Sequence, residues 1–341
     1  MSNEAIPLPI IQAPLAGAQD AGLAIAAAQG GALGSLPAAM LGADALAAEL
    51  ARLAGAGLAQ FNVNFFCHTP PPPDPAREAA WQQALQPYRL ALGLGAAPAS
   101  GGASRQPFSE AMAEVLEAHP PAVVSFHFGL PAPALLARVR RLGAAVWSSA
   151  TTLREALWLQ DQGVDAVIAQ GLEAGGHRGH FLDTDPALQP GTADLLRQLV
   201  PALHVPVIAA GGITDAAGVR AARALGAAAV QAGTAYLLCP EARISTAHRA
   251  ALQDPASRTA LTNLFSGGLA RGIVNRLMRE LGPVSALAPA FPLASGALAP
   301  LRVAAEAQGR GDFSPLWAGT GLAAARALPA AEVSRRLAAG L

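Results

Sequence analysis

Two runs of the chain, Pro206-Val-Ile-Ala-Ala-Gly-Gly-Ile-Thr-Asp215 and Ala228-Ala-Val-Gln-Ala-Gly-Thr-Ala235, follow the same plan. Each is a short apolar strand that ends in glycine, and the first continues into a helix start that Thr214 or Asp215 can cap. By count these are the seventh and eighth strands of a strand–helix repeat. In (β/α)₈ barrels the loops after strands seven and eight commonly bind phosphate, through backbone N–H groups and a helix N-terminus. The pair therefore predicts a barrel with a phosphate site.

Six further apolar runs precede this pair, and Ala/Leu/Arg-rich helical stretches separate them. Such alternation is typical of βαβ units around a parallel sheet, and eight repeats favour a closed barrel over an open sheet. We therefore expect an α/β protein with a (β/α)₈ TIM barrel over residues 1–239. The six expected strands are Ile10–Ala13, Ala32–Ser35, Phe61–Phe65, Val123–Phe128, Ala145–Ser148 and Ala166–Gln170.

The alternation of expected strands and helices ends after Cys239. The stretch from Glu241 to Arg279 has Arg, Ala and Leu at helix-like spacing, which predicts helices there. We expect residues 240–310 to form a small, mostly helical cap beside the barrel mouth. Residues 311–341 are expected to pack back on the barrel, with a final helix between Pro329 and Leu341.

The composition excludes several functions. The 23 basic residues are all arginine, and they balance 23 acidic residues. Without lysine there is no Walker phosphate loop and no lysine Schiff base. A neutral chain lacks the basic stripe expected of nucleic-acid and membrane-surface binders. The two cysteines are far apart, there is no Cys-x-x-Cys and no His-x-x-x-His, and so neither disulfides nor a metal site are expected.

The first nine residues contain Glu4 and no basic residue, so they do not resemble a secretory signal. No clean apolar stretch of about 20 residues is present. We therefore expect a cytoplasmic protein.

The segment from Ala166 to His180 carries the strongest chemical signal. A strand ends in Gln170, and the loop Gly175-Gly-His177-Arg-Gly179 then presents a histidine. His177 could act as a base, an acid or a hydrogen-bond donor, or it could simply be solvated. Arg178 could clamp an anion, and a structural role is equally open.

Polar side chains also mark two earlier strands. Alternation puts Asn62 and Asn64 on one face of the third strand, where they could meet the edge of a flavin ring or pair with neighbouring backbone. His127, at the end of the fourth strand, is a candidate substrate contact or a core histidine. The other histidines at 68, 119, 204 and 248 are assigned no chemistry.

Taken together, these motifs resemble the nitronate monooxygenases, formerly 2-nitropropane dioxygenases, and within them the bacterial class I branch. The resemblance spans nearly the whole chain in order. It runs through Gln12-Ala-Pro14, Phe61-Asn-Val-Asn64, Ser125-Phe-His-Phe-Gly129, Gly175-Gly-His-Arg-Gly179, Ala209-Ala-Gly-Gly-Ile213, Gln231-Ala-Gly-Thr-Ala235 and Leu316-Trp-Ala-Gly319.

The resemblance implies a barrel that binds FMN, with His177 as the active-site histidine. It implies oxidation of alkyl nitronates such as propionate 3-nitronate by O₂, through a flavosemiquinone, to a carbonyl compound plus nitrite or nitrate. We expect a monomer or homodimer acting on a small anionic substrate. By resemblance the cofactor-binding residues are Asn64, Gln170, Gly175, Gly212, Gln231, Ala232, Gly233 and Thr234.

The cap departs from the family pattern. Family members place tyrosines and a lysine near the substrate, but the corresponding stretch from Pro292 to Arg302 has neither. Arg302 is the hypothetical replacement for the lost positive charge, beside His127 as a substrate-binding residue. The alternative enzyme is an NAD(P)H-dependent flavin reductase of the quinone or enoyl-acyl-carrier-protein type on the same fold. A flavin-binding module without turnover is a third possibility.

Overall fold

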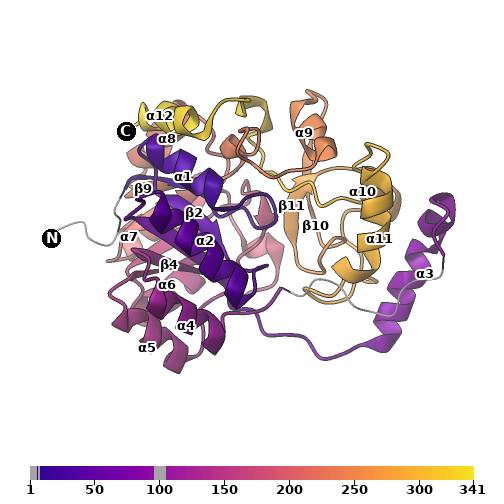
Figure 1. The fold of residues 1–341 in the computed structure, drawn as a ribbon, viewed down its shortest axis with the longest axis horizontal. Helices are drawn as coiled ribbons and strands as arrows, with labels where there is room; N and C mark the ends of the chain where they lie inside the picture. Colours follow the sequence, from indigo (N-terminus) through magenta and orange to yellow (C-terminus); the bar gives the residue numbers. More distant parts are fainter. Residues whose placement is uncertain (1–5, 7, 96–104) are drawn as a thin grey trace.

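The computed structural model describes residue 6, residues 8–95 and residues 105–341 (Figure 1). The secretory-signal argument rests on the first nine residues, most of which lie outside this part. Within it, no helix is both long enough and apolar enough to cross a lipid bilayer.

Eight parallel strands form one sheet in the order β1-β9-β8-β6-β5-β4-β3-β2. The ring closes where β1 meets β2: Ile11 bridges Leu33, and the amide of Leu33 donates to the oxygen of Ile10 at 2.8 Å. The predicted barrel is confirmed. Its strands are β1 (Ile10–Gln12), β2 (Gly34–Pro37), β3 (Phe61–Phe66), β4 (Val123–His127), β5 (Ala145–Ala150), β6 (Ala166–Gln170), β8 (Val207–Ala210) and β9 (Ala229–Ala232).

Helices cover the outside of this ring (Figure 1). The C-terminal helix packs against the first helix. The hydroxyl of Ser334 in the C-terminal helix donates to the backbone oxygen of Ala27 in the first at 2.9 Å. These helices are α1 (Ala21–Gln29), α2 (Ala43–Gly55), α4 (Glu110–Ala118), α5 (Pro133–Arg141), α6 (Leu153–Asp161), α7 (Thr192–Ala202), α8 (Ala216–Ala224) and α12 (Ala330–Ala338). Three short 3-10 helices lie at Pro186–Leu188, Thr234–Tyr236 and Leu322–Ala324.

The inside of the barrel is a packed core. Ile11, Leu33, Trp147, Ile168 and Ile208 are all buried within one cluster contributed by strands around the ring. Burying a side chain of this size stabilises a fold by about 1.5–3 kcal/mol. With its interior filled, the barrel leaves room for a ligand at its mouth, where the strands end.

The cap lies beside this mouth (Figure 1). Its strand β10 (Thr259–Thr262) pairs antiparallel with β11 (Ala270–Ile273), and β11 also pairs with the two-residue strand β7 (Gly176–His177). The expectation of helices from Glu241 to Arg279 is therefore wrong in its middle. Ala270 pairs with Thr262 on one side and with His177 on the other, and helix-like spacing in the sequence does not reveal these pairings. The cap helices are α9 (Thr246–Gln253), α10 (Arg276–Leu281) and α11 (Ser295–Glu306).

One helix from the first half of the chain joins the cap. Helix α3 (Pro75–Ala91) buries Trp81 and Leu85 in a cluster with Leu298 and Leu301 of α11. The indole N–H of Trp81 donates to the oxygen of Ala294 at 3.2 Å. The proposed barrel domain of residues 1–239 thus contains a helix that packs with the cap. The proposed boundaries divide the sequence, but they do not separate the two parts completely in the folded protein.

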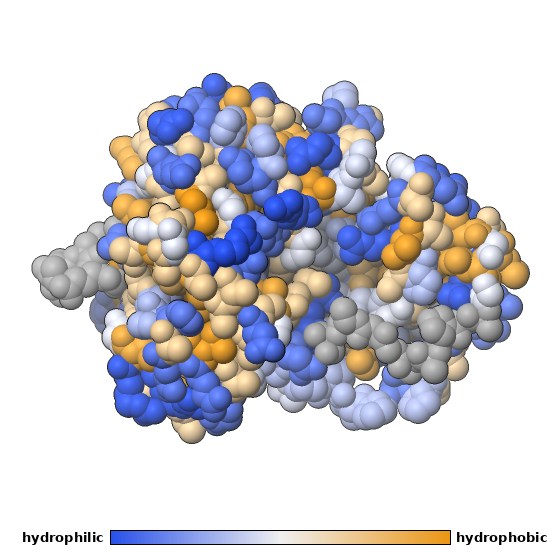
Figure 2. Space-filling view, in the orientation of Figure 1, coloured by the Kyte–Doolittle hydropathy of each residue, from blue (hydrophilic) through white to orange (hydrophobic). Residues whose placement is uncertain are grey.

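The cap also carries exposed apolar side chains (Figure 2). Val284, Leu287 and Val303 are exposed there, the last by 68 %. Isolated exposed apolar residues are common on soluble proteins. Whether the chain is a monomer or a homodimer stays a prediction.

Candidate active site at the mouth of the barrel

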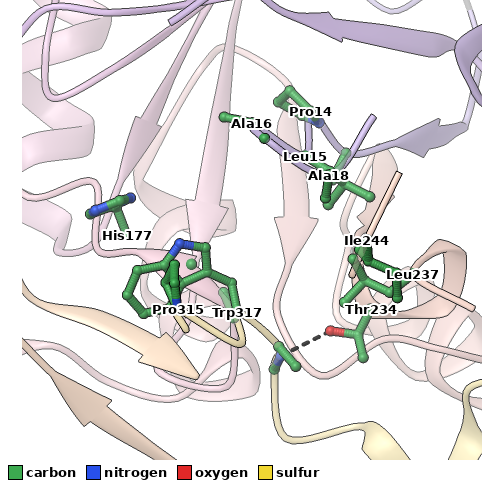
Figure 3. A pocket seen from close by; sticks show the side chains of 18 of the residues that line it. Pro14, Leu15, Ala16, Ala18, His177, Thr234, Leu237, Ile244, Pro315 and Trp317 are labelled. Atoms are coloured by element: carbon green, nitrogen blue, oxygen red, sulfur yellow. Dashed lines mark hydrogen bonds between the residues drawn. The ribbon is translucent and has the colours of Figure 1, made fainter. Parts of the chain in front are cut away.

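A cavity lies where the carboxyl ends of the barrel strands face the cap. Figure 3 shows His177 and Trp317 on one side of it, with the loop from Pro14 to Ala18 on another. Leu237 also faces the cavity (Figure 3). All but one of the predicted site residues line it, namely Asn64, His127, Gln170, Gly175, His177, Gly212, Gln231, Gly233, Thr234 and Arg302.

Ala232 is the exception. It is 2 % exposed and belongs to the hydrophobic core outside the cavity, and its backbone oxygen accepts from the amide of Ala13 at 2.8 Å. Alternation along β9 explains this, because Gln231 points into the mouth and its neighbour must point the other way. The side chain of Ala232 is therefore not placed to touch a ligand.

One end of the cavity offers bare backbone and hydroxyl groups. Strand β8 runs into Gly212, which has a φ of +72°, and Asp215 then caps α8 by accepting from the amide of Gly218 at 2.8 Å. Strand β9 runs into Gly233 and Thr234. Glycine tolerates the positive φ at Gly212 without strain, and the lack of a side chain at Gly212 and Gly233 lets both loops present backbone at close range. This is the loop pair that the sequence predicted as a phosphate site.

Gln231 lies beside these two loops, and its buried side-chain oxygen, Oε1, has no hydrogen-bond partner among the described residues. A buried carbonyl oxygen without a donor is costly, commonly by about 1–3 kcal/mol. The cavity therefore has an acceptor ready for a ligand that carries N–H or O–H groups.

His177 stands at the other end, ringed by aromatic side chains. The centre of its ring lies 5.0 Å from that of Phe291, 5.4 Å from that of Trp317 and 6.1 Å from that of Phe66. Its Nε2 lies 2.8 Å from the hydroxyl of Ser266. Burial, and secondarily the charge of Arg105, lowers the pKa of His177 well below its ordinary value. The imidazole is therefore neutral at pH 7.

The backbone of His177 is held by two strand-end side chains. Its oxygen accepts from Gln170 Nε2 at 2.8 Å and lies 3.1 Å from His127 Nε2. The other ring nitrogen of His127 lies 2.9 Å from Ser149 Oγ, and burial lowers the pKa of His127 to about 4. Gln170 Oε1 also accepts from the amide of Gly179 at 2.8 Å. Both side chains line the cavity and at the same time fix the histidine loop.

The two asparagines of β3 have different surroundings. Asn64 lines the cavity and donates to the hydroxyl of Ser125 at 3.0 Å. Asn62 is fully buried inside the barrel and donates to the hydroxyl of Ser35 at 3.0 Å. Of the two, only Asn64 can reach a ligand in this cavity.

Arg178 is a structural arginine. It is fully buried, and it donates to the oxygens of Gln170 and Gly171 at 2.7 and 2.6 Å and to Gln189 Oε1 at 2.8 Å. Burial lowers its pKa to about 10. Its donors tie the start of the loop together, so the alternative of an anion clamp is wrong.

Arg302 lines the cavity with its guanidinium already paired. Its Nε lies 3.0 Å from Glu306 Oε1, one helical turn further along α11, and the side chain is 45 % exposed. An exposed ion pair of this kind leaves only part of the positive charge for a ligand.

Two histidines to which the sequence assigned no chemistry, and one arginine that it did not single out, lie at or near the cavity. His248 and Arg105 line it, and His68 packs its ring 4.8 Å from that of Phe291. None of these three residues lies in an apolar strand that ends in glycine, which is the pattern that predicted most of the other cavity residues from the sequence. No group of three or more histidine, cysteine or acidic side chains in the described part of the chain could hold a metal ion.

Comparisons with known proteins agree with this geometry. The family model for nitronate monooxygenase matches residues 2–340. A nitronate monooxygenase of Pseudomonas aeruginosa is 43 % identical over 96 % of this chain and 95 % of its own length. One from Paraburkholderia phytofirmans is 42 % identical over 96 % of this chain and 91 % of its own length.

Two solved structures extend the comparison. A nitroalkane oxidase from Streptomyces ansochromogenes has a TM-score of 0.90 at 40 % identity, covering 99 % of this chain and 96 % of its own. FabK from Thermotoga maritima has a TM-score of 0.71 at 22 % identity, covering 98 % of this chain and 92 % of its own, and shares the fold. The chain belongs to the nitronate monooxygenase family.

Proposed function

We propose that this protein binds FMN and uses it to oxidise alkyl nitronates with O₂, giving a carbonyl compound plus nitrite or nitrate. Propionate 3-nitronate is the example we put forward. The observation that carries the proposal is a neutral His177 surrounded by Phe66, Phe291 and Trp317, which we call the aromatic box. This histidine lines the same cavity as the glycine-rich loops after β8 and β9.

The residues of the cavity fit FMN. Backbone at Gly212 and Gly233 and the hydroxyl of Thr234 would hold the phosphate, as such loops do in barrels. The unpartnered Oε1 of Gln231 would accept a hydrogen bond from the cofactor. Asn64 would lie against the ring edge, and Gln170 would line the cavity beside it.

Bound FMN would supply the redox chemistry, and the chain would supply position and polarity. The hydroxyl of Ser266 donates to the oxygen of Gly268 at 3.3 Å, which leaves Nε2 of His177 as the donor to Ser266. Nδ1 is then the unprotonated nitrogen of His177. It can accept a hydrogen bond or a proton from a bound molecule.

The depressed pKa of His177 favours a nitronate over a nitroalkane as substrate. A base whose pKa lies well below its ordinary value takes a proton from a weakly acidic C–H group inefficiently. A nitronate arrives without that proton. The negative charge of the nitronate would favour uptake of a proton by Nδ1 of His177, which would then donate to the nitronate and orient it. The aromatic rings of Phe66, Phe291 and Trp317 would keep water away.

The test is O₂ uptake by the purified, FMN-loaded protein with propionate 3-nitronate, together with the appearance of nitrite or nitrate. We expect uptake that depends on the nitronate. His177→Asn should keep its flavin and lose at least about 100-fold in kcat/KM. A flavin-loaded protein that consumes no O₂ with any alkyl nitronate would rule out the proposal, and unchanged activity in His177→Asn would remove the histidine from it.

A further inference from the structure

Arg105 lies at the edge of the aromatic box. Its guanidinium carbon is 5.9 Å from the centre of the Phe291 ring, and that ring is 5.0 Å from the ring of His177. The half-buried Arg105 side chain lines the same cavity as His177. Since Phe291 contacts both side chains, a ligand of a few atoms' length can reach from one to the other.

The other charged groups that line the cavity have partners. Arg302 pairs with Glu306, the one acidic residue among the described residues that line the cavity, and the two atoms are 3.0 Å apart. Arg243 pairs with Asp20 at 3.2 Å. No ion pair joins Arg105 to any described residue, so its charge faces the cavity without a counter-ion.

The histidines near Arg105 do not add or remove charge at pH 7. Burial lowers the pKa of His68, of His127 and, most strongly, of His177. Burial, followed by the charge of Arg302, also lowers the pKa of Arg105, but a guanidinium stays protonated in proteins. A half-buried guanidinium without an anion is costly, and a planar anion with two oxygens would relieve that cost through paired hydrogen bonds.

We propose that Arg105 binds a carboxylate carried by the substrate at the end opposite its nitronate group. Arg105 would then give propionate 3-nitronate, the substrate proposed above, an advantage over nitronates of the same length without a carboxylate. This inference rests on the proposed function, in which His177 and FMN take the nitronate end. Arg105 rather than Arg302 would supply the positive charge beside the substrate, because the guanidinium of Arg302 is already paired with Glu306.

The first test compares two substrates that differ in one group. Propionate 3-nitronate carries a carboxylate where propyl 1-nitronate carries a methyl group. Arg105→Met should lower kcat/KM for propionate 3-nitronate about 10- to 100-fold and change it less than about threefold for propyl 1-nitronate. Arg105→Lys should recover part of the loss. Arg243→Met, which removes a cavity-lining arginine with its own partner, should leave the ratio between the substrates unchanged.

The second test measures binding without turnover. Succinate and butyrate copy the two substrates with a carboxylate in place of the nitronate, and each is titrated into the FMN-loaded protein while the visible spectrum is followed. Succinate should bind the wild type at least about tenfold more tightly than butyrate, and Arg105→Met should abolish that preference.

Two results would overturn the assignment. Equal losses for both nitronates in Arg105→Met would place the arginine at the nitronate or in the fold, and equal binding of succinate and butyrate by the wild type would exclude a carboxylate site. If the wild type oxidises neither nitronate, the proposed function fails, whereas the succinate titration still decides whether Arg105 binds a carboxylate.

Discussion

His127 holds the backbone of His177, with its Nε2 3.1 Å from the His177 carbonyl oxygen. A carbonyl oxygen only accepts, so Nε2 carries the hydrogen. With a pKa of about 4 the ring is neutral at pH 7, and Nδ1 must therefore accept from the hydroxyl of Ser149, 2.9 Å away. Both ring nitrogens of His127 are therefore hydrogen-bonded to other residues of the protein, and His127 is a positioning residue for the loop that carries His177.

Replacing His127 tests that role. His127→Ala should lower kcat for propionate 3-nitronate about tenfold or more with little change in KM, because the loop that carries His177 loses a fixed hydrogen bond. Ser149→Ala, which leaves Nδ1 without its donor, should show a smaller effect of the same kind. Steady-state kinetics on the flavin-loaded variants separate the two parameters. A raised KM with kcat unchanged would instead identify His127 as the substrate contact suggested by the sequence.

Acid should destabilise the fold through buried histidines. Burial lowers the pKa of His127 and of His248 to about 4, from an ordinary value of 6.5. The unfolded chain therefore binds more protons between these values, and stability is complete above pH 6.5 and falls as the pH drops towards 4. The difference of about 2.5 pH units corresponds to at most about 3.5 kcal/mol for each histidine.

Urea unfolding at pH 7.0, 5.5 and 4.5 measures this loss. His127→Asn should flatten the dependence between pH 6.5 and 4, since one depressed pKa is removed. A slope that is the same in the variant and the wild type would show that His127 does not contribute.

The sequence was sufficient for the barrel and for most of the cavity because both follow local patterns. The apolar runs before Gln170, Gly211 and Gly233 end where the strands end, and parallel strands bring their ends to one face of a barrel. Alternation also separates Gln231, which lines the cavity, from the buried Ala232, but the motif match grouped the two as cofactor contacts.

Strands and site residues that depend on contacts between distant parts of the chain could not be predicted from local sequence patterns. Strand β11 pairs with β10 and also, at Ala270, with His177, which is 93 positions earlier in the chain. Arg105 follows a stretch of small residues without periodicity, and only folding places it against Phe291. The pairing of Arg302 with Glu306 is local, but it could be predicted only if the stretch from Ser295 to Glu306 was recognised as a helix.

The glycine loop after β8 can be tested against a matched glycine elsewhere. Gly212 and Gly57 have the same φ of +72°, but a Cβ at Gly212 would lie 3.1 Å from Glu173 Cβ, while nothing lies within 4 Å of one at Gly57. Both alanine variants should lose about 1 kcal/mol of stability from the strained backbone. Only Gly212→Ala should also bind FMN more weakly, by about tenfold or more, as measured by fluorescence titration of the apoprotein. Equal FMN affinity in both variants would remove Gly212 from the cofactor site.

Arg178 should matter for stability. Arg178→Met removes the guanidinium donors from the buried oxygens of Gln170, Gly171 and Gln189, which should cost about 2 kcal/mol or more in the free energy of unfolding. Arg197→Met is the control, because Arg197 is 60 % exposed and its ion pair is with Asp194 on its own helix. It should cost less than about 0.5 kcal/mol. Similar losses in urea unfolding of the two variants would show that the Arg178 network is not stabilising.

The most direct test of the central claim is anaerobic mixing of the FMN-loaded protein with either propionate 3-nitronate or NADH while the flavin absorbance is followed. The cavity around His177 predicts that the nitronate bleaches the flavin and that NADH leaves it oxidised. Bleaching by NADH with none by the nitronate would contradict the account and identify the protein as a pyridine-nucleotide-dependent flavin reductase.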